Sequence, residues 1–129
     1  MNGREDKQSN DLFFVCSLIE YVGRQTNNER KTIVNALGPK GIKHYYELAE
    51  VYHCENINKV THEIVTKYGI TNGNYNNVAD AEDNIPTYWD IGKVMQRLIS
   101  EVARRSHKDI ITTLIEVYNS WIVPKIDNY

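Results

Sequence analysis

The clearest helical pattern in the chain spans residues 85–103. Thr87 and Asp90 have the spacing of a capping box, in which two side chains bind backbone N–H groups at the start of a helix. Apolar side chains then recur every three or four residues, at Tyr88, Ile91, Met95, Leu98 and Val102, with Val94 and Ile99 widening the stripe. The pattern predicts an amphipathic helix that is covered on at least two sides.

Other segments show the same periodicity. Residues 11–25 are apolar nearly all round, which predicts a helix in the middle of the protein. Thr26 and Glu29 have a second capping-box spacing, which predicts the start of a short helix that runs through Leu37. Further helices are predicted over residues 42–52, 57–68 and 110–122. Because no segment sustains a two-residue alternation, no sheet is predicted. The expected fold is an all-α compact bundle of about six helices.

Helix ends are predicted from residues with known capping preferences. Asn56 and Asp109 are expected to cap the helices that follow them, with Ser106 as the alternative to Asp109. Gly69 is expected to end the helix before it, and Pro124 to end or kink the last one. The Gly38–Pro39 pair is expected to stop the second helix.

The remaining segments are polar. We expect residues 1–10 to form a disordered N-terminal tail before a helix that Asn10 or Asp11 caps, and residues 11–127 to form a single helical domain. Residues 69–86 are rich in Asn and acidic side chains and predict one long loop. Loops of this length are uncommon inside small domains, so this loop either has a function or is a surface segment that tolerates many sequences.

Bulk composition excludes several classes of protein. With 129 residues, 41% hydrophobic residues and a formal net charge of -2, the chain has no global attraction for nucleic acid or acidic membranes. The first residues lack an apolar core, so neither a signal peptide nor a membrane anchor is expected. Cys16 and Cys54 make no disulfide framework, which favours a cytoplasmic protein.

Metal-ligating residue types occur, but in incomplete sets. Glu50 and His53 have the spacing of a di-iron ligand pair, yet a di-iron bundle needs a second such pair. With His62 they form a weak alternative, a metal or small-molecule site, and Cys54 adds a loosely spaced zinc-type ligand. No cofactor is expected, and neither cysteine is persuasive as a catalytic nucleophile.

A DNA-binding regulator is the first alternative function. The turn at Gly38 could join two helices of a helix-turn-helix motif, and its basic residues would be the DNA contacts: Arg30, Lys31, Lys40 and Lys43. Glu47 and Glu50 follow in the second of these helices, and carboxylates that face phosphates work against binding. Nucleic acid is therefore an unlikely partner.

Aromatic composition favours an interface with another protein. The chain has nine Tyr and two Trp but only two Phe, and Tyr and Trp suit half-exposed positions at interfaces. Four aromatic residues are the candidate partner contacts: Tyr75, Tyr88, Trp89 and Trp121. Together with the long loop they predict a non-enzymatic interaction module that covers part of its partner.

Four stretches resemble a family of small uncharacterised all-helical bacterial proteins: FFVCSLIEYVGRQTNNERKTIVNALG, AEVYHCENINKVTHEIVTKYGI, IPTYWDIGKVMQRLI and LIEVYNSWI. The resemblance spans residues 12–127. The family is associated with gene pairs in which a neighbour resembles an ADP-ribosyltransferase-type toxin. The resemblance implies the role of an antitoxin or partner, and it brings no catalytic residues with it.

Overall fold

The computed structural model describes residues 3–75 and 87–120, and this part of the chain contains helices and no strands. The elements are α1 (Gly3–Thr26), α2 (Arg30–Glu47), α3 (Ala49–Tyr52), α4 (Ile57–Tyr68), α5 (Tyr88–Ser106) and α6 (Ile110–Tyr118). The predicted all-α bundle is thereby confirmed. Trp121, Pro124 and the loop beyond Tyr75 lie outside the described residues. No helix in residues 3–75 or 87–120 is long and apolar enough to cross a membrane.

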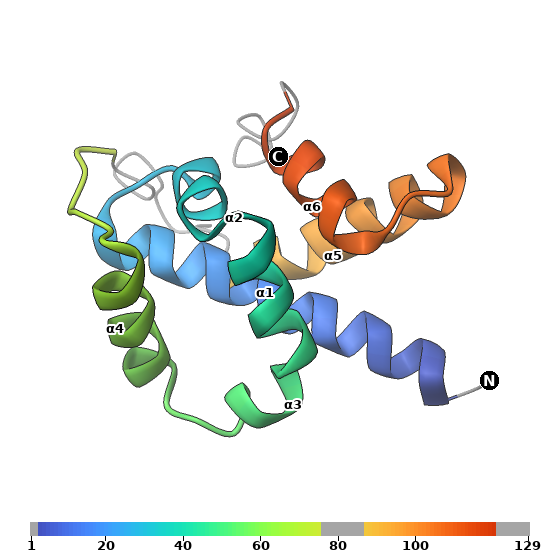
Figure 1. The fold of residues 1–129 in the computed structure, drawn as a ribbon, viewed down its shortest axis with the longest axis horizontal. Coiled ribbons are helices and arrows are strands. Elements are labelled where there is room, and N and C mark those ends of the chain that lie inside the picture. Colours follow the sequence, from blue (N-terminus) through green and yellow to red (C-terminus); the bar gives the residue numbers. More distant parts are fainter. Residues whose placement is uncertain (1–2, 76–86, 121–129) are drawn as a thin grey trace.

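Helix α1 is the central element of the bundle (Figure 1). It packs most extensively against α5 and then against α2, while α6 contacts both α2 and α5. Helices α3 and α4 lie on the other side of α1 from α6 in Figure 1 and make fewer contacts with it. The central place follows from the side chains of α1, which are buried on several faces: Leu12, Val15, Cys16, Leu18, Ile19 and Val22.

The periodic stripe of α5 faces this core as predicted. Ile91, Met95 and Ile99 are almost completely buried, and Leu98 and Val102 pack against them at the edge of the core. Val94 is the exception, because 47% of it is exposed. The stripe therefore widens on the side of Ile99 only.

Local capping signals set the helix ends where the sequence places them. The Thr87 hydroxyl accepts a hydrogen bond from the Asp90 backbone N–H at 3.0 Å, and the Asp90 carboxylate accepts one from the Thr87 N–H at 3.2 Å. Asn56 and Asp109 cap α4 and α6 with their side chains, and Gly69 ends α4 in the left-handed conformation. The Gly38–Pro39 pair does not stop the second helix as expected: Gly38 (φ 67°) kinks α2, which continues to Glu47, and the predicted 42–52 helix is divided between α2 and α3.

The start of α1 corrects one prediction. Helix α1 begins at Gly3 and not at Asn10 or Asp11, so residues 3–10 are helical where a disordered tail was expected. Lys7 Nζ lies 2.7 Å from the Asp11 carboxylate, one helical turn along, and 3.4 Å from the carboxylate of Glu50 in α3. Such a pair stabilises a polar helical turn that buries no apolar stripe, so periodicity alone misses it.

Candidate functional site

A groove of about 920 Å³ lies between the first half of α1, α3, the start of α4 and the first turn of α5. Its deepest side chains belong to the core: Leu18, Ala49 and Val60 are each almost fully buried. Phe14 and Ile57 are half-buried and continue this apolar lining towards the surface. The groove is thus an outward extension of the hydrophobic core.

One wall of the groove is aromatic. The rings of Phe13 and Trp89 stack with their centroids 4.8 Å apart, and the Tyr88 ring lies 5.6 Å from that of Trp89. Lys93 Nζ lies 5.1 Å from the centroid of the Phe13 ring, within the range of a cation–π contact. Although it stacks on Phe13, Trp89 is 53% exposed. A large aromatic surface is therefore open to solvent beside an apolar groove.

A close approach of α1 and α5 holds this wall together. A Cβ atom at Gly92 would lie 2.4 Å from Ser17 Oγ and 3.0 Å from the Ser17 Cα and backbone N atoms. Only a glycine leaves room for the two helices to approach so closely at this point. The approach sets the first turn of α5, one turn before Gly92, directly against Phe13.

The opposite side of the groove is held by a hydrogen-bonded cluster that ties α4 to α2 and α3. The hydroxyls of Tyr45 and Tyr52 donate to the same Glu63 carboxylate oxygen, at 2.9 Å and 3.1 Å. His44 Nε2 lies 3.1 Å from the Tyr52 hydroxyl oxygen. Burial and the neighbouring Glu63 raise the pKa of both tyrosines. The phenols therefore stay protonated to a higher pH than an ordinary tyrosine does.

The charged side chains on the rim of the groove are paired with one another. Three carboxylates line it, from Asp11, Glu50 and Glu55, against one ammonium group, that of Lys7. The hydrogen bond to Asp11 raises the pKa of Lys7, and Glu50 contributes to the shift. The charge of Lys7 is thus already offset by two of the three carboxylates. Glu55 pairs at 3.4 Å with Lys59, whose side chain is 76% exposed, which is a weak surface contact.

The four predicted partner contacts do not form one surface. Tyr88 and Trp89 line the groove. Tyr75 is 38% exposed, but its backbone N–H donates to the Asn27 carbonyl at 2.9 Å, just beyond the C-terminal end of α1. The groove lies along the N-terminal half of that helix. Trp121 lies outside the described residues, so the structure places it on neither surface.

The candidate metal ligands are only partly brought together. Glu50 and His53 both line the groove, whereas His62 lies on α4 and is not among the lining residues. Within residues 3–75 and 87–120, no three His, Cys, Asp or Glu side chains are grouped so that they could hold a metal ion. The geometry thus gives Glu50 and His53 a place in the groove and no third ligand.

One of the four candidate DNA contacts is buried, and the other three are exposed lysines. Arg30 is only 8% exposed, and its guanidinium donates to both oxygens of Glu20 at 2.6 Å and 2.8 Å. It joins α2 to α1 inside the protein, which corrects its assignment to a DNA-binding surface. Lys31 and Lys43 are exposed and lie 3.6 Å and 4.0 Å from Glu29 and Glu47. Lys40 is exposed.

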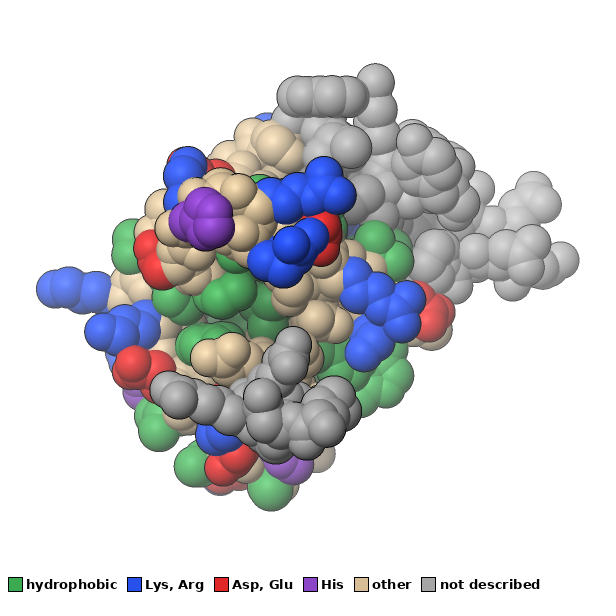
Figure 2. All heavy atoms as spheres, turned by 90° about the vertical axis from the view of Figure 1, so that its right-hand side faces the viewer, with side chains coloured by type: hydrophobic (Ala, Val, Ile, Leu, Met, Phe, Trp, Pro, Cys, Tyr) green, Lys and Arg blue, Asp and Glu red, His purple; other side chains and the backbone are tan. Residues whose placement is uncertain are grey.

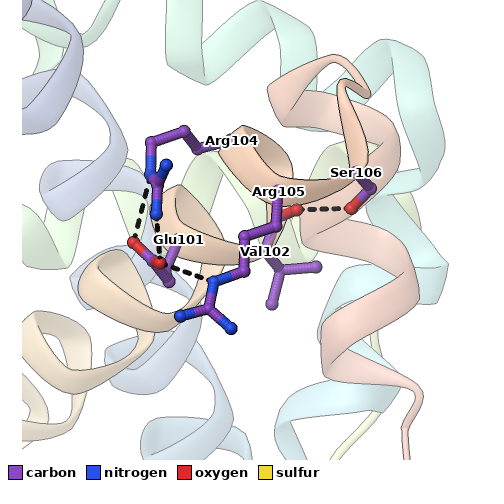
Figure 3. Close-up of polar contacts among 5 residues, drawn as sticks. All are labelled: Glu101, Val102, Arg104, Arg105 and Ser106. Carbon is purple, nitrogen blue, oxygen red and sulfur yellow. Dashed lines mark hydrogen bonds and ion pairs between the residues drawn. The ribbon is translucent and has the colours of Figure 1, made fainter.

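A second basic region lies at the end of the molecule where α5 passes into α6. Figure 2 looks onto this end and shows Lys and Arg side chains with acidic side chains between them. Arg104 and Arg105 both donate to the Glu101 carboxylate, the latter at 2.7 Å, and Ser106 donates to the Val102 carbonyl (Figure 3). The hydrogen bond from Arg104 lowers the pKa of Glu101. These arginines therefore bind their own helix and do not form an unopposed cationic surface.

Several groove residues were missed or misassigned in the sequence. Phe13 and Phe14 belong to the helix that was expected in the middle of the protein, and Lys7 belonged to the expected tail. Tyr52, at the end of the predicted 42–52 helix, lines the groove as well. The pattern carries no signal that separates a fully buried apolar position from one on the wall of a groove. The i,i+4 spacing of Lys7 and Asp11 was the one available hint.

The chain matches no family model, no curated protein and no solved structure among those with which it was compared. Functional inference therefore depends on the groove and the residues around it.

Proposed function

We propose that the protein is a protein–protein interaction module that binds its partner through the groove. The observation that carries the proposal is the exposed Trp89, stacked on Phe13 at the edge of an apolar groove that continues into the core. Aromatic anchors next to a desolvated pocket dominate the binding energy of many interfaces, and a polar rim surrounds them. Lys7, Asp11 and Glu50 supply such a rim.

The experiment is recovery of the partner from native-host cells with tagged wild-type protein and two variants. Trp89→Ala removes the exposed anchor, and Val94→Ala is the matched control, because Val94 is 47% exposed on the same helix and does not line the groove. We expect one protein to be recovered with wild type and Val94→Ala and lost with Trp89→Ala. Equal recovery by all three would show that binding does not use the groove.

For the partner we propose an ADP-ribosyltransferase-like toxin encoded beside this chain, with the chain acting as its antitoxin. The support for this part is the family resemblance over residues 12–127, and occlusion of the toxin's active site is the mechanism. Co-expression supplies the test: wild type should restore growth of cells that make the neighbouring protein, and Trp89→Ala should restore it less. Growth arrest that persists with wild type would remove the antitoxin role and leave the interaction module standing.

We further propose a cytoplasmic location. The support is cysteine usage, because Cys16 and Cys54 are both free thiols, and a reducing compartment keeps thiols in that state.

Binding of a small organic molecule is the second candidate function. The groove volume of about 920 Å³ falls within the range of about 300–1,000 Å³ that is common for ligand sites. Glu50 and His53 would supply the orienting polar groups. Native mass spectrometry of untagged protein distinguishes the two candidates. A bound small molecule would add a fixed mass to the protein, whereas binding of a protein partner would leave no such small added mass.

A further inference from the structure

We infer that Asn72 is a site of spontaneous deamidation that the fold keeps unreactive, and that it reacts only when residues 70–75 leave the turn between α1 and α2. The site lies outside the groove. Asn72 is followed by Gly73, and an asparagine before a glycine deamidates readily, because glycine has no side chain to hinder the attacking nitrogen. Both residues of this pair belong to the part of the chain that the structure describes.

The reaction uses only the atoms of this pair and water. The Gly73 backbone nitrogen loses its proton and attacks the carbonyl carbon of the Asn72 side chain. The new C–N bond closes a succinimide ring, and the side-chain nitrogen leaves as ammonia, which takes up the proton. Water then opens the ring at either carbonyl, so that aspartate or isoaspartate stands at position 72. The chain gains a negative charge, and nothing is oxidised or reduced.

The fold holds the attacking nitrogen in a hydrogen bond. Figure 1 shows the segment after α4, in yellow-green, returning to the turn between α1 and α2. There the Gly73 N–H donates to the Thr26 carbonyl at 2.8 Å, and the Tyr75 N–H donates to the Asn27 carbonyl at 2.9 Å. Thr26 is buried, so water competes poorly for the first of these bonds. An amide proton held in this way is released only when the segment opens, which is the event that hydrogen exchange reports.

The Asn28 side chain holds the backbone on both sides of Asn72. Its Nδ2 atom donates to the Thr71 carbonyl at 2.9 Å and to the Thr26 hydroxyl oxygen at 2.9 Å. A Cβ atom at Gly73 would overlap its Oδ1 atom, so the Gly73 backbone passes directly against this side chain. Ring closure requires the Asn72 side chain and the Gly73 nitrogen to rotate towards each other. A backbone that is held at both neighbours of Asn72 opposes this rotation.

Peptide mapping by mass spectrometry, after incubation of the full chain at mildly alkaline pH, tests the inference. The rate of deamidation at residue 72 is compared among folded wild type, wild type unfolded in guanidinium chloride, and two variants whose fold is checked by circular dichroism. Asn28→Ala removes the side chain that holds the segment. Asn35→Ala is the matched control, because it removes an asparagine whose amide pairs at 3.0 Å with Asn119 and so joins α2 to the end of α6 instead.

We expect residue 72 to deamidate at least about tenfold more slowly in folded wild type than in the unfolded chain. Folded Asn28→Ala should react several-fold faster than wild type, and Asn35→Ala at the wild-type rate. Equal rates in folded and unfolded wild type would overturn the inference, and so would an Asn28→Ala rate no higher than that of Asn35→Ala.

Hydrogen exchange of the Gly73 N–H supplies a second measurement that needs no variant. As guanidinium chloride is added below the unfolding transition, exchange of this proton and deamidation of residue 72 should accelerate together, because both need the same opening. This series decides the question if Asn28→Ala does not fold. Deamidation that stays constant while the exchange accelerates would show that the docked segment does not protect Asn72.

Discussion

Replacing Gly92 with alanine tests the close approach of α1 and α5, on which the aromatic wall depends. The new Cβ would lie 2.4 Å from Ser17 Oγ and 3.0 Å from two backbone atoms of Ser17. A hydroxyl can rotate away, but the backbone atoms yield only if the helices separate. Overpacking of this kind costs about 3 kcal/mol at the upper end of the usual range. The higher helix propensity of alanine offsets about 1 kcal/mol of this cost, so the free energy of unfolding should fall by about 2 kcal/mol.

Urea unfolding followed by circular dichroism measures this loss. With a slope of roughly 2 kcal/mol per molar urea, the midpoint should fall by roughly 1 M. Ser17→Ala is the control, because it removes a buried hydroxyl that has no hydrogen-bond partner among the described residues. That variant alone should be neutral or slightly stabilising. In combination with Gly92→Ala it should recover only part of the loss, since the backbone contacts at 3.0 Å remain.

A Gly92→Ala protein as stable as wild type, or more stable, would refute the reasoning. That outcome would mean that only the gain in helix propensity is felt and that α1 and α5 are not in close contact at this point. Full recovery by the double variant would be a milder contradiction. It would show that the Ser17 hydroxyl, and not the backbone of α1, is what limits the approach.

Two further predictions concern titratable groups. Burial raises the pKa of the Cys16 thiol, whereas Cys54 is exposed, so a thiol reagent should modify Cys54 in the folded protein and Cys16 only on unfolding. Hydrogen bonds from Thr112 lower the pKa of Asp109 at the start of α6. Its stabilisation is complete above the unfolded pKa of about 4 and is lost as the pH falls through the lower folded pKa. Acid titration should therefore destabilise Asp109→Asn less than wild type, and identical acid curves would contradict this cause.

Local signals in the sequence determined the helices and most of their ends. The Thr87–Asp90 capping box, the Asn56 and Asp109 caps and the Gly69 terminus all appear as predicted. Each of these caps is formed by groups only a few residues apart in the sequence, so it forms without contacts to distant parts of the chain. Apolar periodicity likewise identified the buried face of α5 apart from Val94, because burial follows the rhythm of the helix.

Tertiary structure alone decided which residues share a site. Trp89 was a candidate from its residue type, but nothing in the sequence pairs it with Phe13, which belongs to another helix. The same holds for Arg30. It was predicted as a DNA contact on the surface, but in the structure its guanidinium pairs with Glu20 of α1 in the interior. Apolar periodicity identifies an apolar face of a helix. It does not tell which other helix packs on that face or how far along the face the packing extends. The groove exists where that cover ends along the first half of α1, and only the packing of α3, α4 and α5 determines this place.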